Sequence, residues 1–577
     1  MFLRMKYKKR AQQKKTLAPQ NHDENLVNRQ ENRIKNEKSG DSQKPSEFFL
    51  HSVFTKELEP NLALFENALG SNMDLLIRRF TIELNDDLIS CGLVHLDGSS
   101  SKTDINDILA ALMFTIDQSQ QRGTSAFRVI YSQCIPYADV AIKNSPREAA
   151  DWIIAGNSIL FLDGYERVIG LSTQAFKERA VEQSQTEQVI QGSREAFIES
   201  IGTNVSLIRK RMRSTDLKVH KIQIGEETAT NVAFCYLEGI ANEALVNEVK
   251  KRLEVVKTDS LYGSGYLEQF IEDSPFSPFP QVQNTERPDK AVASILEGRV
   301  AILVDGSPFC LIVPAVFSQF YQTTEDYDTR FLMASLIRAI RLISLLFALI
   351  FPSVYVSLIE YNPEMIPTKF AVAVAGGRAG VPFPAIVEIF GLEIIMEILR
   401  EATIRLPQQI GGALSIVGVL VIGEAAVNAG FVSPITVVVV SLTTIGSFAT
   451  PAYNAAIALR MLRFPLMIIS GIFGLYGVMV GIILITNHLI KLESFGVPYL
   501  SPLLPGNKFG FFDSIIRAPV WMMSKRPEQL QTGKATRIKV NQETLKNQKG
   551  RPLAPQYQNI SENSSTSSTP NDESNQP

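Results

Sequence analysis

Cysteine is scarce in this chain. It occurs four times among 577 residues, at widely spaced positions in apolar surroundings. No C-x-x-C pair and no histidine at ligand spacing accompanies these cysteines, which excludes a zinc motif. Such a low number also excludes the dense disulfide framework of a small secreted domain. We therefore expect buried thiols in a reducing compartment at Cys91, Cys134, Cys235 and Cys310.

Motifs for catalysis and nucleotide binding are missing as well. The sequence has no H-E-x-x-H, G-x-S-x-G, G-x-x-x-x-G-K-[ST] or G-x-G-x-x-G, and its five histidines are scattered. We expect no enzyme, no metal site and no cofactor. The 57 Lys and Arg nearly balance the 59 Asp and Glu, for a formal charge of −2. This balance argues against nucleic acid as a partner of the whole protein.

Both ends of the chain have few large apolar residues. Residues 1–47 are rich in Lys, Asn, Gln and Glu, and residues 527–577 are of low complexity, so disordered tails are predicted. The basic start, MFLRMKYKKR, lacks the apolar core of a cleaved secretory signal. We therefore expect the polar N-terminal half on the cytoplasmic side.

Two stretches of that half resemble each other. GNSILFLDG at 156–164 and GRVAILVDG at 298–306 each combine a glycine, a β-rich apolar run and Asp-Gly at one spacing. A further apolar strand follows each Asp-Gly, which predicts a hairpin whose turn needs a positive φ. The expected fold is thus multi-domain, with two tandem α/β subdomains at residues 48–180 and 216–325.

A helical segment joins the two subdomains within residues 181–215. SREAFIESIGTNVSLIRKRMR, from Ser193 to Arg213, predicts a connecting helix with Phe197 and Ile201 on its apolar face. Basic residues at the C-terminal end of this segment suit the helix dipole. Contact with phosphate or lipid is the alternative.

Charge nearly vanishes between Arg341 and Lys491. Residues 342–359 carry none and, with their flanks, reach the ~20 residues that cross a bilayer core. We read further spans at 382–402, twice within 406–459 with a turn at Ser433-Pro434, and at 464–487. The result is an all-α polytopic membrane domain of about five spans at residues 330–495. Residues 496–526 predict an interfacial or re-entrant segment.

Basic residues at the span ends predict the orientation. With the N-terminal half inside, the positive-inside rule is met by Arg330, Arg338, Arg341, Arg400, Arg405, Arg460 and Arg463. Five spans place the C-terminus outside, whereas Arg517, Lys525 and Arg526 favour the inside. The side of the C-terminal tail stays open.

Ionisable groups at membrane depth are functional candidates because burying a charge there is costly. The second predicted span carries Glu388, Glu393, Glu397 and Glu401. The last three follow an i, i+4, i+8 pattern on one face, and the first lies nearly opposite. Copies of that face in an oligomer would form carboxylate rings along a cation pathway. In the alternative, Glu397 pairs with Arg400 at the cytoplasmic end of the helix, and Glu401 with Arg405.

One more carboxylate and four glycines complete the candidates. Glu424, alone between two apolar runs, is either a buried hydrogen-bonded carboxyl or part of an ion route. In the last span, small-residue spacing predicts tight helix packing at Gly471, Gly474, Gly477 and Gly481.

The sequence resembles the A subunit of the GerA-type nutrient germinant receptors of endospore-forming bacteria, over residues 47–525. The motifs are the connecting segment quoted above, YNPEMIPT at 361–368, VPFPAIVEIFGLEIIMEILREATIRLP at 381–407 and IGGALSIVGVLVIGEAAVNAGFVSP at 410–434. Ser193 departs from the proline expected in the family's Gly-Pro-Arg-Glu start, which leaves the predicted helix intact.

The resemblance implies a multi-pass protein of the spore inner membrane. It implies a transporter-like B subunit that binds the nutrient, a lipoprotein C subunit, and homo-oligomerisation around an ion pathway that opens in germination. Membrane lipid is a further expected partner. Two other classes stay open: an ion-coupled secondary transporter that uses Glu424, and a membrane-anchored scaffold that recruits germination partners.

Overall fold

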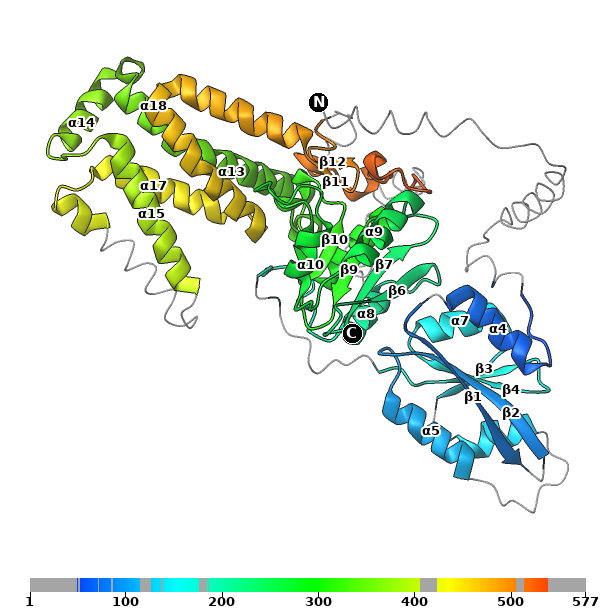
Figure 1. Ribbon diagram of the computed structural model, residues 1–577. Coiled ribbons are helices and arrows are strands. Elements are labelled where there is room, and N and C mark those ends of the chain that lie inside the picture. Colours follow the sequence, from blue (N-terminus) through cyan, green and yellow to red (C-terminus); the bar gives the residue numbers. More distant parts are fainter. Residues whose placement is uncertain are drawn as a thin grey trace, which may run out of the picture.

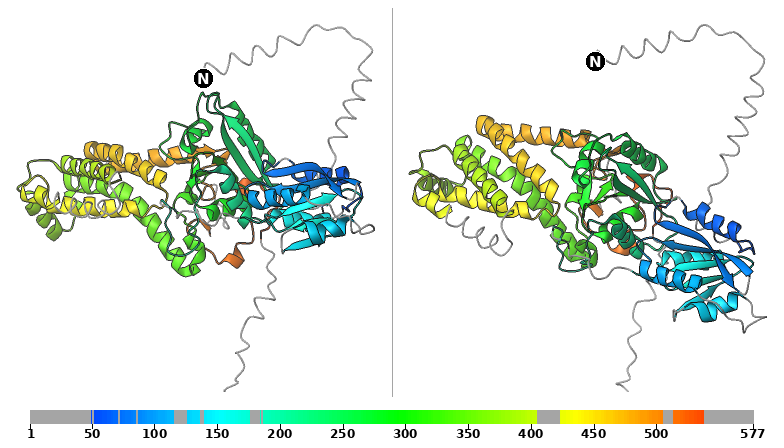
Figure 2. Two further views of the ribbon diagram at one scale, coloured as in Figure 1. Left: turned by 90° about the horizontal axis from the view of Figure 1, so that it is seen from below. Right: turned by 60° about the horizontal axis from the view of Figure 1, so that its bottom comes forward.

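The computed structural model describes residues 49, 52–70, 72–84, 87–114, 126–135, 139–175, 184, 186–404, 423–504 and 513–537. Figures 1 and 2 show two α/β units followed by an elongated helical region that extends from the second unit. The predicted N-terminal tail lies outside the described residues.

The first α/β unit is a five-stranded sheet in the order β1-β2-β4-β5-β3, with every neighbouring pair antiparallel. Helices cover the sheet and bury their apolar faces in two clusters. Its elements are α4 (Leu58–Leu69), β1 (Leu75–Leu84), β2 (Asp87–Leu96), α5 (Lys102–Phe114), α6 (Ala126–Val129), β3 (Val140–Lys143), α7 (Pro146–Ile154), β4 (Ser158–Leu162) and β5 (Val168–Leu171).

The second unit repeats this topology, in the order β6-β7-β9-β10-β8. Its hairpin β9–β10 corresponds to β4–β5, and the glycines of the two turns, Gly164 and Gly306, have φ of +88° and +81°. The predicted pair of hairpins is therefore present. The elements are α8 (Ile201–Arg211), β6 (Leu217–Ile224), β7 (Thr230–Leu237), α9 (Glu243–Val255), α10 (Ser264–Ile271), β8 (Gln283–Thr285), α11 (Pro288–Glu297), β9 (Val300–Val304) and β10 (Cys310–Val313).

The cores of both sheets contain free thiols. Cys91, Cys235 and Cys310 are buried and form no disulfide. Burial raises the pKa of Cys91 and of Cys235 to about 12, so both stay protonated and unreactive at neutral pH. The expectation of buried thiols is confirmed for these three, while the side chain of Cys134 lies outside the described residues.

The connecting helix is shorter than the sequence predicts. α8 begins at Ile201 rather than at Ser193, and Phe197 is buried in the non-helical approach to it. At this start the Ile201 amide donates to Asp305 Oδ1 at 3.2 Å, and Arg211 at the far end of α8 donates to the Ser193 hydroxyl at 2.6 Å. At the basic end of α8, Arg209 is buried. Its guanidinium forms a bidentate pair with Asp74, at the start of the first sheet.

The helical region begins directly after the second sheet. α12 (Glu325–Asp328) leads into α13 (Phe331–Glu360), which is followed by α14 (Thr368–Arg378), α15 (Ala385–Ile404), α17 (Pro434–Phe448) and α18 (Tyr453–Lys491). Two of these, α13 and α18, are long and apolar enough to cross a membrane, and α17 is a shorter apolar helix. Ser433 caps α17, where the sequence predicted a turn. α17 ends at Phe448, before the end of the 406–459 stretch in which the sequence predicted two spans.

The last predicted span, residues 464–487, is not one straight helix, so this prediction is wrong. At Gly474 the backbone leaves the helix, with φ +61° and ψ −145°, and α18 divides into two arms. The arms bend back toward the α/β part, as Figure 1 shows. A Cβ placed at Gly481 would overlap Leu466, although a straight helix would hold these residues ~22 Å apart. The bend returns the chain to its starting side.

The C-terminal segment packs on the second sheet unit. β11 (Glu493–Ser494) pairs with β12 (Val497–Pro498), and the Ser494 hydroxyl donates to the Gln281 carbonyl at 2.7 Å. Arg526 Nε donates to the Leu296 carbonyl at 2.7 Å, and the Gly533 amide to the Ile240 carbonyl at 3.1 Å. The prediction that the chain is disordered from residue 527 is therefore wrong for residues 527–537. Residues 538–577 lie outside the described chain.

Candidate functional site

Glu393 is a buried carboxylate in the helical region. It sits on the side of α15 that faces α17 and α18, and 4% of the residue is exposed. Arg463 Nη1 lies 2.5 Å from its Oε2, and the Thr443 hydroxyl donates to its Oε1 at 3.2 Å. A charge this deep is tolerable because an opposite charge and a hydrogen-bond donor hold it.

Glu397, one turn further along α15, is bound in the same way. Its carboxylate lies 2.7 Å from Arg400 Nη1 and 3.4 Å from Arg460 Nε, and 44% of its side chain is exposed. Arg463 and Arg460 are one helical turn apart on the first arm of α18. We call Glu393, Glu397, Arg400, Arg460 and Arg463 the glutamate–arginine cluster.

This cluster is not fully satisfied. It sets three guanidinium groups against two carboxylates. Within the described chain, Nε of Arg400 and Nε of Arg463 are buried without a hydrogen-bond partner. Buried donors of this kind call for an acceptor from water, another chain or another state of the protein.

The third carboxylate of the predicted face, Glu401, is exposed near the end of α15. Its predicted partner Arg405 lies outside the described residues. The structure thus brings Glu393 and Glu397 together on one face and finds the predicted pairing of Glu397 with Arg400. In this single chain both carboxylates pair with arginines, and only Glu397 also keeps an exposed part.

Glu388 has a separate environment. It is 3% exposed and pairs with Arg378 at 3.0 Å. Its other oxygen accepts from the Ser433 amide at 2.9 Å and from the Thr436 hydroxyl at 3.0 Å. An anion at this position accepts from the amide of the N-cap residue of α17 and is favoured by the positive end of the helix dipole. Glu388 therefore joins α14, α15 and α17.

Glu424 and the glycines differ in their surroundings. Glu424 is exposed and has no ion pair in the part of the chain described here. A Cβ at Gly471 would overlap Ile386 of α15, and one at Gly474 would meet the Tyr361 ring. One at Gly477 would meet the Ile469 carbonyl. The glycines thus lie at close approaches around the bend of α18.

A charged junction at the base of α13 was not anticipated. Arg338, fully buried, lies 3.2 Å from Asp326 of α12 and 3.5 Å from Asp513 of the C-terminal segment. Arg341 also binds Asp326, at 2.8 Å. Tyr327 donates to Asp513 at 3.1 Å. The sequence analysis used Arg338 and Arg341 only as basic residues at a span end, and their acidic partners come from separate segments.

Comparison with known proteins finds a matching family and similar proteins that cover most of this chain. The family model described as Bacillus/Clostridium GerA spore germination protein matches residues 63–529. Spore germination protein KA of Bacillus subtilis (strain 168) is 42% identical over 479 residues, 83% of this chain and 87% of that protein. The uncharacterized membrane protein YfkQ of the same strain is 42% identical over 475 residues, 82% of this chain and 90% of that protein.

One solved structure is similar in sequence to the N-terminal half. It is the crystal structure of the N-terminal domain of the A subunit of the Bacillus megaterium spore germinant receptor GerK3. That structure is 35% identical, covers 46% of this chain and 98% of its own, and has a TM-score of 0.38.

Proposed function

The chain belongs to the Bacillus/Clostridium GerA spore germination protein family, and from this premise we propose that it is the A subunit of a nutrient germinant receptor. The observation that carries the proposal is the extent of the family match. It covers residues 63–529 and so includes both α/β sheets, the helical region and most of the C-terminal segment. The protein then acts in signalling: it helps to convert the presence of a nutrient into the start of germination.

Spores that lack the chain test this role. Deletion of its gene in the parent organism should abolish or slow germination with at least one nutrient, while germination forced by high pressure or a surfactant continues. A panel of single amino acids, nucleosides and sugars identifies the nutrient. Unchanged germination with every nutrient, in spores that retain no second receptor, would contradict the proposal.

The proposed location is the spore inner membrane, with a multi-pass helical region and the α/β units on the cytoplasmic side. α13 and α18 have the required length and composition. The first arm of α18, from 453 to 473, has 473 − 453 + 1 = 21 residues, about the length of one bilayer crossing. Counting the two arms as separate crossings brings the C-terminal segment back to the α/β side, where Arg517, Lys525 and Arg526 suit the positive-inside rule.

Homo-oligomerisation around an ion pathway is the finer part of the proposal. Next to the glutamate–arginine cluster, α15 has an exposed face with Ile394, Ile398 and Glu401, three residues at helical spacing. An exposed apolar face with a carboxylate at its end suits contact with further copies of the chain better than contact with lipid alone. The Glu393, Glu397, Glu401 face is the proposed lining of the cation pathway in the open state.

The resting state is then one in which the chain's own arginines neutralise that lining. Glu393 is held by Arg463, and Glu397 by Arg400 and Arg460. Opening requires α15 and the first arm of α18 to move relative to each other. A nutrient drives this change only if it binds the open arrangement more tightly than the closed one.

Replacement of the three carboxylates tests the pathway. Spores with Glu393→Gln, Glu397→Gln and Glu401→Gln together should release little or no potassium after nutrient addition, although the subunit is present at its normal level. Glu364→Gln is the matched control, because that carboxylate is exposed on the loop after α13. Normal release from the triple variant would remove these side chains from the mechanism.

A transporter-like B subunit, which binds the nutrient, and a lipoprotein C subunit are the proposed partners. The family membership supports this assignment. Affinity purification of the tagged chain from spore membranes should recover both subunits in fixed ratio. Recovery of the chain alone under mild detergent would argue for a subunit that works without them.

A further inference from the structure

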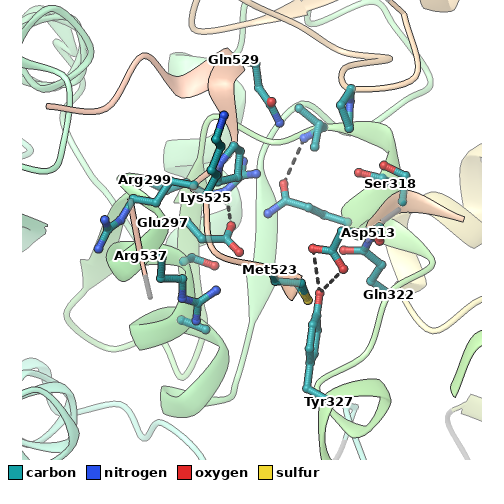
Figure 3. Close-up of a pocket in the computed structure, with 18 of the residues that line it drawn as sticks. Glu297, Arg299, Ser318, Gln322, Tyr327, Asp513, Met523, Lys525, Gln529 and Arg537 are labelled. Carbon is teal, nitrogen blue, oxygen red and sulfur yellow. Dashed lines mark hydrogen bonds and ion pairs between the residues drawn. The ribbon is translucent and has the colours of Figure 1, made fainter. Parts of the chain in front are cut away.

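A cavity of about 780 Å³ lies where three parts of the chain meet. Its walls come from α11, from the segment that leads into α13, and from the C-terminal segment, and we call it the junction cavity. Figure 3 shows Glu297, Arg299, Lys525 and Arg537 around one side and Ser318, Gln322 and Asp513 around the other. The volume falls within the ~300–1,000 Å³ of small-molecule sites. The junction cavity is separate from the glutamate–arginine cluster.

The charge of its lining favours an anion. Five basic side chains, Lys290, Arg299, Lys525, Arg526 and Arg537, face three acidic ones, Glu297, Asp513 and Glu528, for a difference of 5 − 3 = +2. Several of these charges are already engaged, such as Lys290 with Glu187 at 2.6 Å. Within the described chain the Arg537 guanidinium forms no hydrogen bond or ion pair, and its electrostatic partner there is Glu297. It is therefore available to a carboxylate or phosphate group.

A second observation specifies the ligand further. Gln283, which also lines the cavity, is 2% exposed, and its amide nitrogen donates to the Gln319 carbonyl at 3.3 Å. Its Oε1 is buried and has no hydrogen-bond partner among the described residues. A buried acceptor without a donor is costly, and a ligand hydroxyl would supply the missing donor. The complementary molecule thus has both an acidic group and a hydroxyl.

The cavity wall also contacts the anchor of α13. Tyr327 and Asp513 line the cavity, and Asp513 pairs with Arg338 of α13 at 3.5 Å. Trp521, on the C-terminal segment, stands edge-on to Phe331, the first residue of α13, with ring centroids 6.4 Å apart. A ligand held between these elements would change how α13 is fixed to the second α/β unit.

We propose that the junction cavity binds a small hydroxylated organic anion, and that its binding alters the anchoring of α13. Such a ligand acts from within the A subunit, at a place distinct from the ion pathway. The proposal does not depend on the germination role, because it concerns binding by this chain alone.

Citrate and glycerol 3-phosphate are suitable probes, one for the carboxylate and one for the phosphate form of the ligand. The purified full chain in detergent micelles is titrated with each at constant ionic strength, with glycerol as the uncharged control. Binding should be saturable for at least one anion and absent for glycerol. Citrate alone identifies a carboxylate ligand, and glycerol 3-phosphate alone identifies a phosphate ligand.

Two variants locate the site. Arg537→Gln should weaken binding about tenfold or more, since it removes a charged hydrogen-bond donor from an exposed side chain. Ala293→Phe should block binding by filling the cavity that Ala293 lines. Arg78→Gln removes the same charge from an exposed position on β1 and should bind as the native chain does. If Ala293→Phe does not fold, Arg537→Gln decides.

Trp521 reports the effect on α13. With Trp152→Phe, it is the one remaining tryptophan, and its fluorescence should change saturably with the bound anion. No saturable binding below about 10 mM, or equal binding by the native chain and Arg537→Gln, would overturn the proposed site. Binding without a change at Trp521 would overturn the link to α13. Each of these results is independent of whether spores need the chain for germination.

Discussion

Glu393→Gln should weaken the closed state of the helical region. The carboxylate is 4% exposed and lies 2.5 Å from Arg463, so its neutralisation leaves a buried guanidinium without a counter-charge. Loss of one partner of a buried pair costs ~3–5 kcal/mol, and we take ~3 because glutamine still accepts a hydrogen bond. Since each ~1.4 kcal/mol is tenfold, the closed-to-open equilibrium should shift about 100-fold. An open fraction of ~0.1% would then become ~10%.

The assay is spontaneous germination without nutrient. Spores with Glu393→Gln should lose potassium and refractility in buffer far faster than native spores, because Glu397 and Glu401 still line the pathway. The double variant Glu393→Gln with Arg463→Gln removes both charges and should restore much of the dormancy, as coupled residues do. The proposed resting state would be refuted if spores with Glu393→Gln alone, at the native protein level, stayed as dormant in buffer as native spores. The double variant would then have nothing to restore.

Three further predictions concern stability. Asp74→Ala should lower the free energy of unfolding by about 3–5 kcal/mol in denaturant, since it strands the buried Arg209, while Asp107→Ala, on the exposed side of α5, changes it little. Gly474→Ala should reduce the amount of folded protein in membranes, because its φ of +61° and the nearby Tyr361 ring disfavour a Cβ, whereas Gly376→Ala in open space should not. Burial, together with Glu268, raises the pKa of Glu272 to about 7. Ionisation of Glu272 therefore disfavours the folded state, and the stability of the protein should fall as the pH rises from about 5 to 8. Glu272→Gln should make the thermal unfolding temperature less dependent on pH over this range.

Local signals predicted the α/β part well. Each hairpin has its apolar strands and its Asp-Gly turn within a short window, and glycine at 164 and at 306 indeed adopts a positive φ. These windows indicated the repeated hairpin alone, and the order of five strands that the two sheets share was not predicted. The helix start at 201 was not predicted, because the bond from the Ile201 amide to the distant Asp305 forms only in the folded protein.

Contacts between distant residues explain what the sequence did not reveal. Arg463 is 70 positions from Glu393, so periodicity within one helix does not identify it as the partner. The bend lies at Gly474 and not at Pro465, the proline of the same charge-free apolar run, and the spacing of the glycines was compatible with straight helix packing. The segment at 527–537 is polar, and its order depends on backbone contacts such as that of Gly533 with Ile240.

Current through the reconstituted receptor tests the central claim most directly. The chain would be placed in liposomes with its two partner subunits, and the cation current recorded before and after addition of the nutrient found with deletion spores. The account predicts a current that the nutrient opens in the native receptor and that the triple glutamine variant at 393, 397 and 401 lacks. A receptor that never conducts, or a triple variant that conducts like the native one, would contradict it.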